Sequence, residues 1–165
     1  MSNDTSHGFT LMELMVTIAV VAILATVGVP AFNNLIREGA ASTEGNTLLG
    51  AIQLARSEAV KRGVSIWIVP QTSTNWQAGW EIRVDDGDTT FDSSKDTLLR
   101  RFDGIKSTVN ASHNQLRIAA NGTLAVPNSA STFKLKPSGC QNNEQRLLTV
   151  QVSGRASLSR ISCSS

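Results

Sequence analysis

The first third of the chain has a helical pattern of apolar positions that begins with an unbroken apolar run. Residues 14–32 follow one another without a charge, nineteen positions in all. In an α-helix this run covers roughly 28 Å at about 1.5 Å per residue, which is close to the thickness of the hydrocarbon layer of a bilayer. The run therefore predicts a helix that spans a membrane.

The helical pattern continues beyond the apolar run to about Arg62, but there it becomes amphipathic. Apolar residues recur at steps of three and four, at Leu48, Ile52, Ala55 and Ala59. This spacing gives the helix one apolar face, with charged residues on the other side. We expect the apolar face to pack on a folded domain, and we expect Gly63 to end the helix.

After Gly63 the apolar residues alternate with a period of two, which predicts β-strands. Seven segments have this pattern: 64–69, 80–84, 97–102, 115–119, 132–135, 147–152 and 156–161. The polar stretch 71–79 is expected to connect the first two strands, and the last two are expected to form a hairpin around Gly154. The pattern therefore predicts an α+β fold, with a long N-terminal helix packed on an antiparallel sheet.

Composition limits the classes of function. The 165 residues suffice for one anchored domain, and a formal net charge of +2 does not indicate a nucleic-acid-binding protein by itself. His7 and His113 are the only histidines, and no spacing brings them into a metal site or beside a nucleophile. Glycine loops that bind phosphate are also missing from the sequence, so we expect neither an enzyme nor a cofactor.

Cys140 and Cys163 are the only cysteines. A membrane anchor at the other end of the chain would send them out of the cytoplasm, where an oxidising compartment permits a disulfide. Such a bond would stabilise the fold by roughly 3 kcal/mol in the chain-entropy model. Two free thiols are the alternative.

One acid lies at the start of the apolar run, in the sequence Gly8-Phe9-Thr10-Leu11-Met12-Glu13-Leu14. An ionised carboxylate in hydrocarbon costs at least roughly 3 kcal/mol on insertion scales, so Glu13 is expected to be functional or paired. The alternative is that its side chain only reaches back to the membrane interface.

This sequence resembles the processing site of type IV pilins and type II secretion pseudopilins. The resemblance implies that a prepilin peptidase cleaves between Gly8 and Phe9 and that Phe9 is N-methylated. It implies that Glu13 faces the amino terminus of a neighbouring subunit during assembly. The chain then divides into a leader 1–8, a transmembrane and assembly helix 9–32, an amphipathic continuation 33–62 and a globular β domain 63–165.

The same resemblance implies a place in the cell. The chain would cross the bacterial inner membrane once, with the globular domain in the periplasm, and would reach the cell surface as part of a pilus. Its partners would be the prepilin peptidase, the inner membrane and other pilin subunits, which it would contact through the N-terminal helix.

Three features further along are similar to minor pilins of the FimT and FimU type and to the related GspH pseudopilins. They are the run Leu-Ala-Arg-Ser-Glu-Ala-Val-Lys-Arg at 54–62, Gly79-Trp80 before an acidic turn, and a late Gly154-Arg155. In this type IV pilin-like group a β-sandwich packs on the helix. The resemblance implies a non-catalytic minor pilin that acts in pilus assembly. A GspH-like minor pseudopilin of a type II secretion system remains the alternative, because it shares all of these motifs.

The basic C-terminal part adds a DNA-binding hypothesis. FimT-type minor pilins implicated in natural transformation bind double-stranded DNA through a Gly-Arg-x-Arg element, and segment 154–160 is similar but places its second arginine further along. The resemblance implies principal contacts from Arg155 and Arg160, with Lys134, Lys136 and Arg146 as auxiliary contacts. On a regular strand Arg155 and Arg160 point to opposite faces. Solvated surface arginines are the alternative.

Two other groups of side chains have more than one interpretation. The acids Asp85, Asp86, Asp88 and Asp92 could hold Ca²⁺, but their order does not match an EF-hand loop, so a solvated turn is favoured. Trp76 and Trp80 are expected to be half-buried packing residues, and a stacking surface for nucleic-acid bases is the alternative.

Overall fold

The structure is a computed structural model that describes residues 9–163, without the side chains at positions 27, 30, 31 and 34. Its internal contacts divide the chain into two units, residues 1–36 and residues 37–165. The leader 1–8 lies outside the described residues, and so does the Gly8 side of the expected cleavage site.

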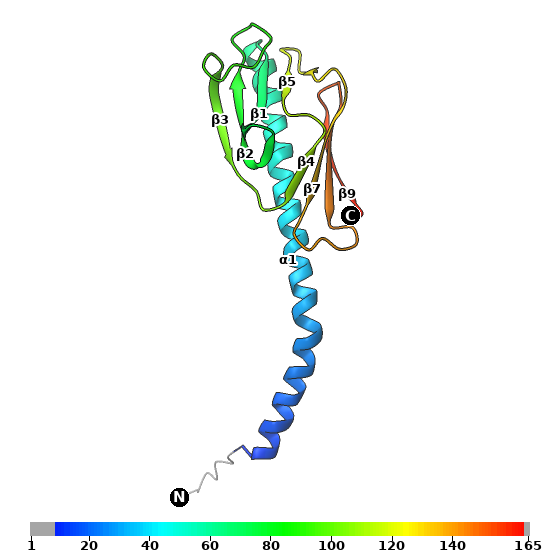
Figure 1. The fold of residues 1–165 in the computed structure, drawn as a ribbon. Helices are drawn as coiled ribbons and strands as arrows, with labels where there is room; N and C mark the ends of the chain where they lie inside the picture. Colours follow the sequence, from blue (N-terminus) through cyan, green and yellow to red (C-terminus); the bar gives the residue numbers. More distant parts are fainter. Residues whose placement is uncertain (1–8, 164–165) are drawn as a thin grey trace, which may run out of the picture. The chain divides into compact units, whose positions relative to one another are not determined.

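A single helix, α1 (Leu11–Arg62), runs through the first part of the chain (Figure 1). It begins three residues before the unbroken apolar run, and Gly63 ends it as expected. Gly63 has a φ of +69° and donates its backbone N–H to the carbonyl oxygen of Ala59 at 2.9 Å. Counting only the described residues, no helix is both long enough and apolar enough to cross a membrane.

Between the helix and residue 163, the last described residue, nine strands form two antiparallel sheets. The strands are β1 (Ile66–Thr72), β2 (Asn75–Val84), β3 (Thr97–Asp103), β4 (Thr108–Ala111), β5 (Leu116–Ile118), β6 (Leu124–Val126), β7 (Ser131–Lys136), β8 (Gln145–Val150) and β9 (Ala156–Ile161). The five-stranded sheet has the order β3-β2-β1-β5-β6, and the four-stranded sheet has the order β4-β7-β8-β9. The fold is therefore a helix packed on antiparallel sheets, the expected α+β class.

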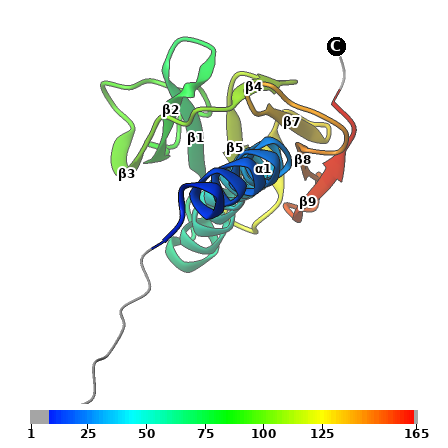
Figure 2. The same cartoon turned by 90° about the horizontal axis from the view of Figure 1, so that it is seen from below.

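The buried face of α1 within residues 37–62 is built mainly from small residues. Ala41, Gly45, Leu48, Ile52, Ala55 and Ala59 follow one another at steps of four and three, and Ala51 beside them is buried as well. A Cβ at Gly45 would lie only 3.0 Å from a methyl group of Leu158 on β9. Small side chains let the helix backbone approach the strands closely, and Figure 2, seen from below, shows α1 between the strands of the two sheets.

The strand predictions were wrong in two places. Residues 71–79 do not form a polar connection, because β2 already begins at Asn75 and a short turn with Ser73 at a φ of +45° joins it to β1. The short strands β4 and β6 were not predicted. With four and three residues, they are too short to show a period of two.

The tryptophans are core residues. Trp76 and Trp80 are 1% and 0% exposed, so they are fully buried rather than half-buried. The Trp76 ring meets Phe133 edge to face at 4.8 Å, and its Nε1–H donates to the carbonyl oxygen of His113 at 3.1 Å. The alternative of a base-stacking surface at these residues was therefore wrong.

Cys140 and Cys163 form a disulfide that joins the β7–β8 connection to the segment after β9. The backbone N–H of Cys163 also donates to the carbonyl oxygen of Asn142 at 2.8 Å. The bond closes a loop with a sequence separation of 23 residues around β8 and β9. In the chain-entropy model a loop of this size contributes about 3 kcal/mol to stability.

Candidate functional site

Glu13, the acid at the start of the apolar run, is hydrogen-bonded to Thr10 in the first turn of α1. The backbone N–H and the hydroxyl of Thr10 donate to Glu13 Oε2 at 3.1 and 3.0 Å, and the backbone N–H of Glu13 donates to Thr10 Oγ1 at 3.3 Å. This reciprocal pair is a capping box, which satisfies two N–H groups that have no partner inside the helix. The carboxylate of Glu13 therefore has hydrogen-bond donors within its own chain.

The acidic segment after β2 is a loop that folds on its own hydrogen bonds. Asp96 accepts backbone N–H groups from Asp86 at 3.1 Å and from Asp92 at 2.8 Å. Asp85 pairs with Arg117, whose Nε lies 2.6 Å from Asp85 Oδ2. Carboxylate oxygens of Asp85, Asp86 and Asp96 come within 4.8 Å of one another, but each of these acids also serves donors in this loop or the Arg117 guanidinium. Asp86 and Asp88 are exposed, as a solvated turn requires, but Asp85 is buried against Arg117, so the favoured interpretation was wrong for Asp85.

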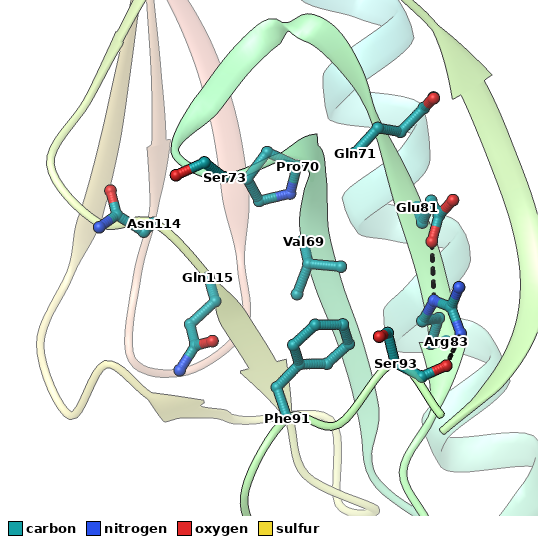
Figure 3. A pocket seen from close by; sticks show the side chains of 10 residues that line it. All are labelled: Val69, Pro70, Gln71, Ser73, Glu81, Arg83, Phe91, Ser93, Asn114 and Gln115. Carbon is teal, nitrogen blue, oxygen red and sulfur yellow. Dashed lines mark hydrogen bonds and ion pairs between the residues drawn. The ribbon is translucent and has the colours of Figure 1, made fainter. Parts of the chain in front are cut away.

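A hollow of about 360 Å³ lies on the five-stranded sheet beside this loop. Figure 3 shows Glu81 paired with Arg83, which also donates to the carbonyl oxygen of Ser93. Burial raises the pKa of the Glu81 carboxyl, but hydrogen bonds from Arg83 and Arg101 outweigh burial and hold that pKa below its usual value. Glu81 is thus ionised and paired with two guanidinium groups, and these ion pairs stabilise the fold.

Arg146 corrects the sequence prediction most clearly. Its side chain is 3% exposed, and its guanidinium donates to Ser42 Oγ at 2.7 Å, to Glu38 at 3.4 Å and to the Glu144 carbonyl oxygen at 3.1 Å. These partners fill the hydrogen-bonding capacity of the group inside the molecule. Arg146 therefore cannot be an auxiliary DNA contact, because its guanidinium would have to leave a buried network to reach a phosphate.

Arg160 lies opposite Arg146 in the β8–β9 register. Its Nη2 is 2.7 Å from Glu38 Oε1, so one carboxylate of α1 faces two arginines of the four-stranded sheet. The Arg160 side chain is 67% exposed. Alternation along β9 puts it on the same face as Leu158, which contacts α1 at Gly45.

Arg155 lies at the other end of β9. Five residues separate it from Arg160, which is about 16 Å at roughly 3.3 Å per residue. The structure thus does not bring these two arginines together. The Arg155 side chain is exposed and makes no hydrogen bond or ion pair within residues 9–163.

Lys134 and Lys136 lie on the outer face of the four-stranded sheet, because their neighbours Phe133 and Leu135 are buried beneath it. Lys134 is exposed and Lys136 is half-buried. None of the four strands in this sheet contains an Asp or a Glu. The strands themselves therefore supply no carboxylate beside Lys134 on the outer face.

Two turns fix the position of Arg155. In the β8–β9 turn the backbone N–H of Gly154 donates to the Gln151 carbonyl oxygen and that of Gln151 donates to the Arg155 carbonyl oxygen, both at 2.8 Å. Gly154 has a φ of +76° and lies directly against the carbonyl oxygen of Gly122 in the β5–β6 turn. Arg56 Nε donates to the same oxygen at 3.1 Å. The two turns and α1 therefore meet at one point.

Sequence reasoning missed both Arg56 and Glu38 as members of these clusters. Arg56 follows Ala55 of the apolar face, so its place at the edge of that face could be predicted from the helical period. Its contact with Gly122 was not readable, because 66 residues separate the two.

Two models of known protein families match this chain. The family model described as "Type II transport protein GspH" matches residues 44–155, and the one described as "Prokaryotic N-terminal methylation motif" matches residues 4–29. The prepilin peptidase-dependent protein D of Escherichia coli (strain K12) is 51% identical over 37 residues, which are 22% of this chain and 25% of that protein. The chain thus matches only a quarter of that relative's length.

Solved structures similar to this one include two crystal forms of the type IV minor pilin FimU from Pseudomonas aeruginosa (strain PAO1). Each match covers 72% of this chain. The first form is 28% identical, is covered over 91% of its length and has a TM-score of 0.59. The second is 27% identical, is covered over 87% of its length and has a TM-score of 0.60. The minor pseudopilin EpsH from the Type 2 Secretion System of Vibrio cholerae covers 73% of this chain and 97% of its own, at 16% identity and a TM-score of 0.52. At that identity EpsH shows a shared fold alone.

Proposed function

This chain belongs to the GspH family and is a minor pilin or pseudopilin with an N-terminal methylation motif, and we propose, more narrowly, that it is a minor pilin of a type IV pilus. The observation that supports the narrower proposal is the likeness to FimU, at 27–28% identity over 72% of the chain. The family and its solved neighbours are structural subunits and not enzymes. A minor pseudopilin of a type II secretion system is the competing proposal.

In the proposed life cycle the chain is inserted once in the inner membrane through residues 14–32, with residues 63–165 in the periplasm. A prepilin peptidase then cleaves between Gly8 and Phe9, and the new amine of Phe9 is N-methylated. The helix of the processed subunit packs among those of other pilin subunits, and the domain reaches the cell surface with the pilus. The uncharged apolar run at residues 14–32 supports this proposal.

Processing can be tested on the full chain. Co-expression with a prepilin peptidase should yield a membrane protein whose intact mass lacks residues 1–8 and includes one additional methyl group on Phe9. A Gly8→Val variant should stay full length, because a branched side chain at the cleavage position obstructs the peptidase site. An unprocessed parent chain in the presence of an active peptidase would contradict the proposal. A chromosomal deletion that removes pili but leaves type II secretion intact would separate pilin from pseudopilin.

We also propose that this pilin binds double-stranded DNA through the outer face of the four-stranded sheet. The specific observation is that Lys134 is exposed on this face and that Arg155 is exposed at the β8–β9 turn at the end of the sheet, whose strands carry no acid. A basic surface of this kind binds phosphates by releasing counterions, which makes the affinity depend steeply on salt. Arg160 is a weaker candidate because Glu38 already pairs with it.

Titration of fluorescent double-stranded DNA with the full chain in detergent, at several salt concentrations, tests this second proposal. Arg155→Gln and Lys134→Gln should each lower the affinity several-fold and reduce the slope of log K against log salt by about one. Arg100→Gln is the matched control, since it removes one positive charge from β3 on the other sheet. Equal effects of all three variants would mean that the affinity depends only on the net charge of the protein and not on this face. No binding by the parent chain at low salt would exclude the DNA function.

A further inference from the structure

The hollow on the five-stranded sheet has an apolar floor. Ile66 and Ile68 of β1 belong to the core that α1 covers, so by alternation along the strand Val69 lies on the opposite face of the sheet. Val69 is 4% exposed, and Figure 3 shows it with Pro70 at the centre of the residues that line the hollow. The floor therefore offers hydrocarbon and no charge.

Side chains and a turn enclose this floor on four sides (Figure 3). The ion pair of Glu81 and Arg83 closes one side, and segment 114–115 closes the opposite side. Phe91 lies at one end, and the β1–β2 turn lies at the other. The volume of about 360 Å³ is near the lower limit of small-molecule sites, so a compact ligand fits this hollow better than an extended chain does.

The rest of the fold holds the walls of the hollow in place. Phe91 meets the fully buried Trp67 edge to face, with 5.9 Å between the ring centroids. Arg83 donates to the backbone carbonyl oxygens of Ser93 at 3.0 Å and Asp96 at 2.8 Å, which fixes the loop between β2 and β3. The aromatic wall is thus in position before a ligand arrives, and such preorganisation lowers the entropy cost of binding.

The polar groups of the hollow are neutral overall and are partly unused. Glu81 and Arg83 neutralise each other, and among the described residues no other charged side chain lines the hollow. Within residues 9–163 the side-chain amides of Asn114 and Gln115 have no hydrogen-bond partner. Each amide can donate and accept hydrogen bonds, as a hydroxyl does. An ionic ligand would find no unpaired charge here, whereas a neutral ligand rich in hydroxyls would find partners.

We propose that this hollow binds a neutral sugar ring. A pyranose has an apolar face of C–H groups, which packs on Val69 and the Phe91 ring, and a rim of hydroxyls, which bond to Asn114 and Gln115. Because the hollow holds about one ring, we expect a dissociation constant on the order of 1 mM for a monosaccharide. The hollow shares no residue with the proposed DNA-binding face, so the two proposals stand or fall separately.

The test is saturation-transfer NMR on the full chain in a zwitterionic detergent that has no sugar head group. The probes are glucose, galactose, mannose and N-acetylglucosamine, and the comparison ligands are sorbitol, an acyclic polyol, and a capped trialanine peptide. At least one sugar should receive saturation. Sorbitol and the peptide should not, because neither has a ring with an apolar face.

Variants locate the bound sugar. Asn114→Ala and Phe91→Leu should each raise the dissociation constant at least about fivefold, since each removes one contact with the ring. Asn110→Ala is the matched control, because Asn110 is an exposed asparagine on β4 of the other sheet, and it should leave the dissociation constant unchanged. Asn114 is itself exposed, so Asn114→Ala should unfold at the temperature of the parent and remains informative if Phe91→Leu loosens the loop.

Three results would overturn the sugar site. One is the absence of saturation transfer to all four sugars at about 10 mM, roughly ten times the expected dissociation constant. Another is transfer to sorbitol or to the peptide as strong as transfer to the sugars. The third is an equal loss of affinity in Asn110→Ala and Asn114→Ala, which would place the bound sugar elsewhere.

Discussion

A Gly154→Ala variant is expected to lose about 3 kcal/mol or more of unfolding free energy, because two costs act at one position. The residue has a φ of +76°, which an alanine adopts only with strain, and the added Cβ would overlap the carbonyl oxygen of Gly122. That oxygen belongs to backbone, so no side chain can rotate away to make room. For a chain of this length the loss corresponds to a fall of about 10 °C in the unfolding midpoint.

Thermal unfolding of the full chain in detergent, followed by the circular dichroism of the β-sheets, measures this effect. Gly50→Ala is the matched control, because Gly50 is an exposed helical residue with no atom within 4 Å of an added Cβ. The control should be more stable by up to about 1 kcal/mol, since alanine is the better helix former. If Gly154→Ala unfolded at the temperature of the parent, the two turns could not be packed as described.

A Glu13→Gln variant is expected to be excluded from the assembled filament while its helix stays intact. Glutamine can still accept the N–H and hydroxyl donors of Thr10, so the capping box of α1 survives the change. What disappears is the negative charge that we propose to pair with the amine of a neighbouring subunit. Leaving that amine unpaired in a water-poor interface costs at least about 3 kcal/mol, or on the order of 100-fold in the equilibrium for incorporation.

The measurement is the amount of this subunit in sheared and purified pili relative to the amount in the membrane. Thr10→Ala is the informative partner, because it removes the cap at a cost of about 1 kcal/mol but keeps the carboxylate. If assembly depends on the charge, Thr10→Ala is incorporated far better than Glu13→Gln. The reverse order would show that the cap, and not the charge, is what assembly requires.

The sequence allowed prediction of features that depend on local period and chain chemistry. Periodicity placed α1 to within three residues at its start, and Gly63 and Gly154 were identified as a helix end and a turn. The pairing of β8 with β9 followed from two adjacent alternating runs, and the even number of cysteines pointed to the disulfide. Alternation on β9 also indicated that Arg155 and Arg160 would not share a face.

The features that could not be predicted depend on contacts between distant parts of the chain. Arg146 was expected to be an auxiliary DNA contact, but Glu38 and Ser42, more than a hundred residues earlier, stabilise it inside. The burial of Trp76 likewise depends on Phe133 and on the carbonyl oxygen of His113. The contact of Arg56 with the Gly122 and Gly154 turns is of the same kind, since it combines a helix residue with two turns that only the tertiary fold brings together.

The cluster of Glu38, Ser42 and Arg146 also determines how the domain would carry mechanical load. A pull on the N-terminal side enters this unit at Arg37, and the contacts of Glu38 and Ser42 then join α1 to Arg160 on β9 and to Arg146 on β8. β9 is an edge strand and β8 is an inner strand paired with both β7 and β9, so the force is shared between the two strands and the hydrogen-bond ladders on both sides of β8. Unfolding would then require many bonds to break together, whereas a load placed on the edge strand alone would peel them apart one at a time.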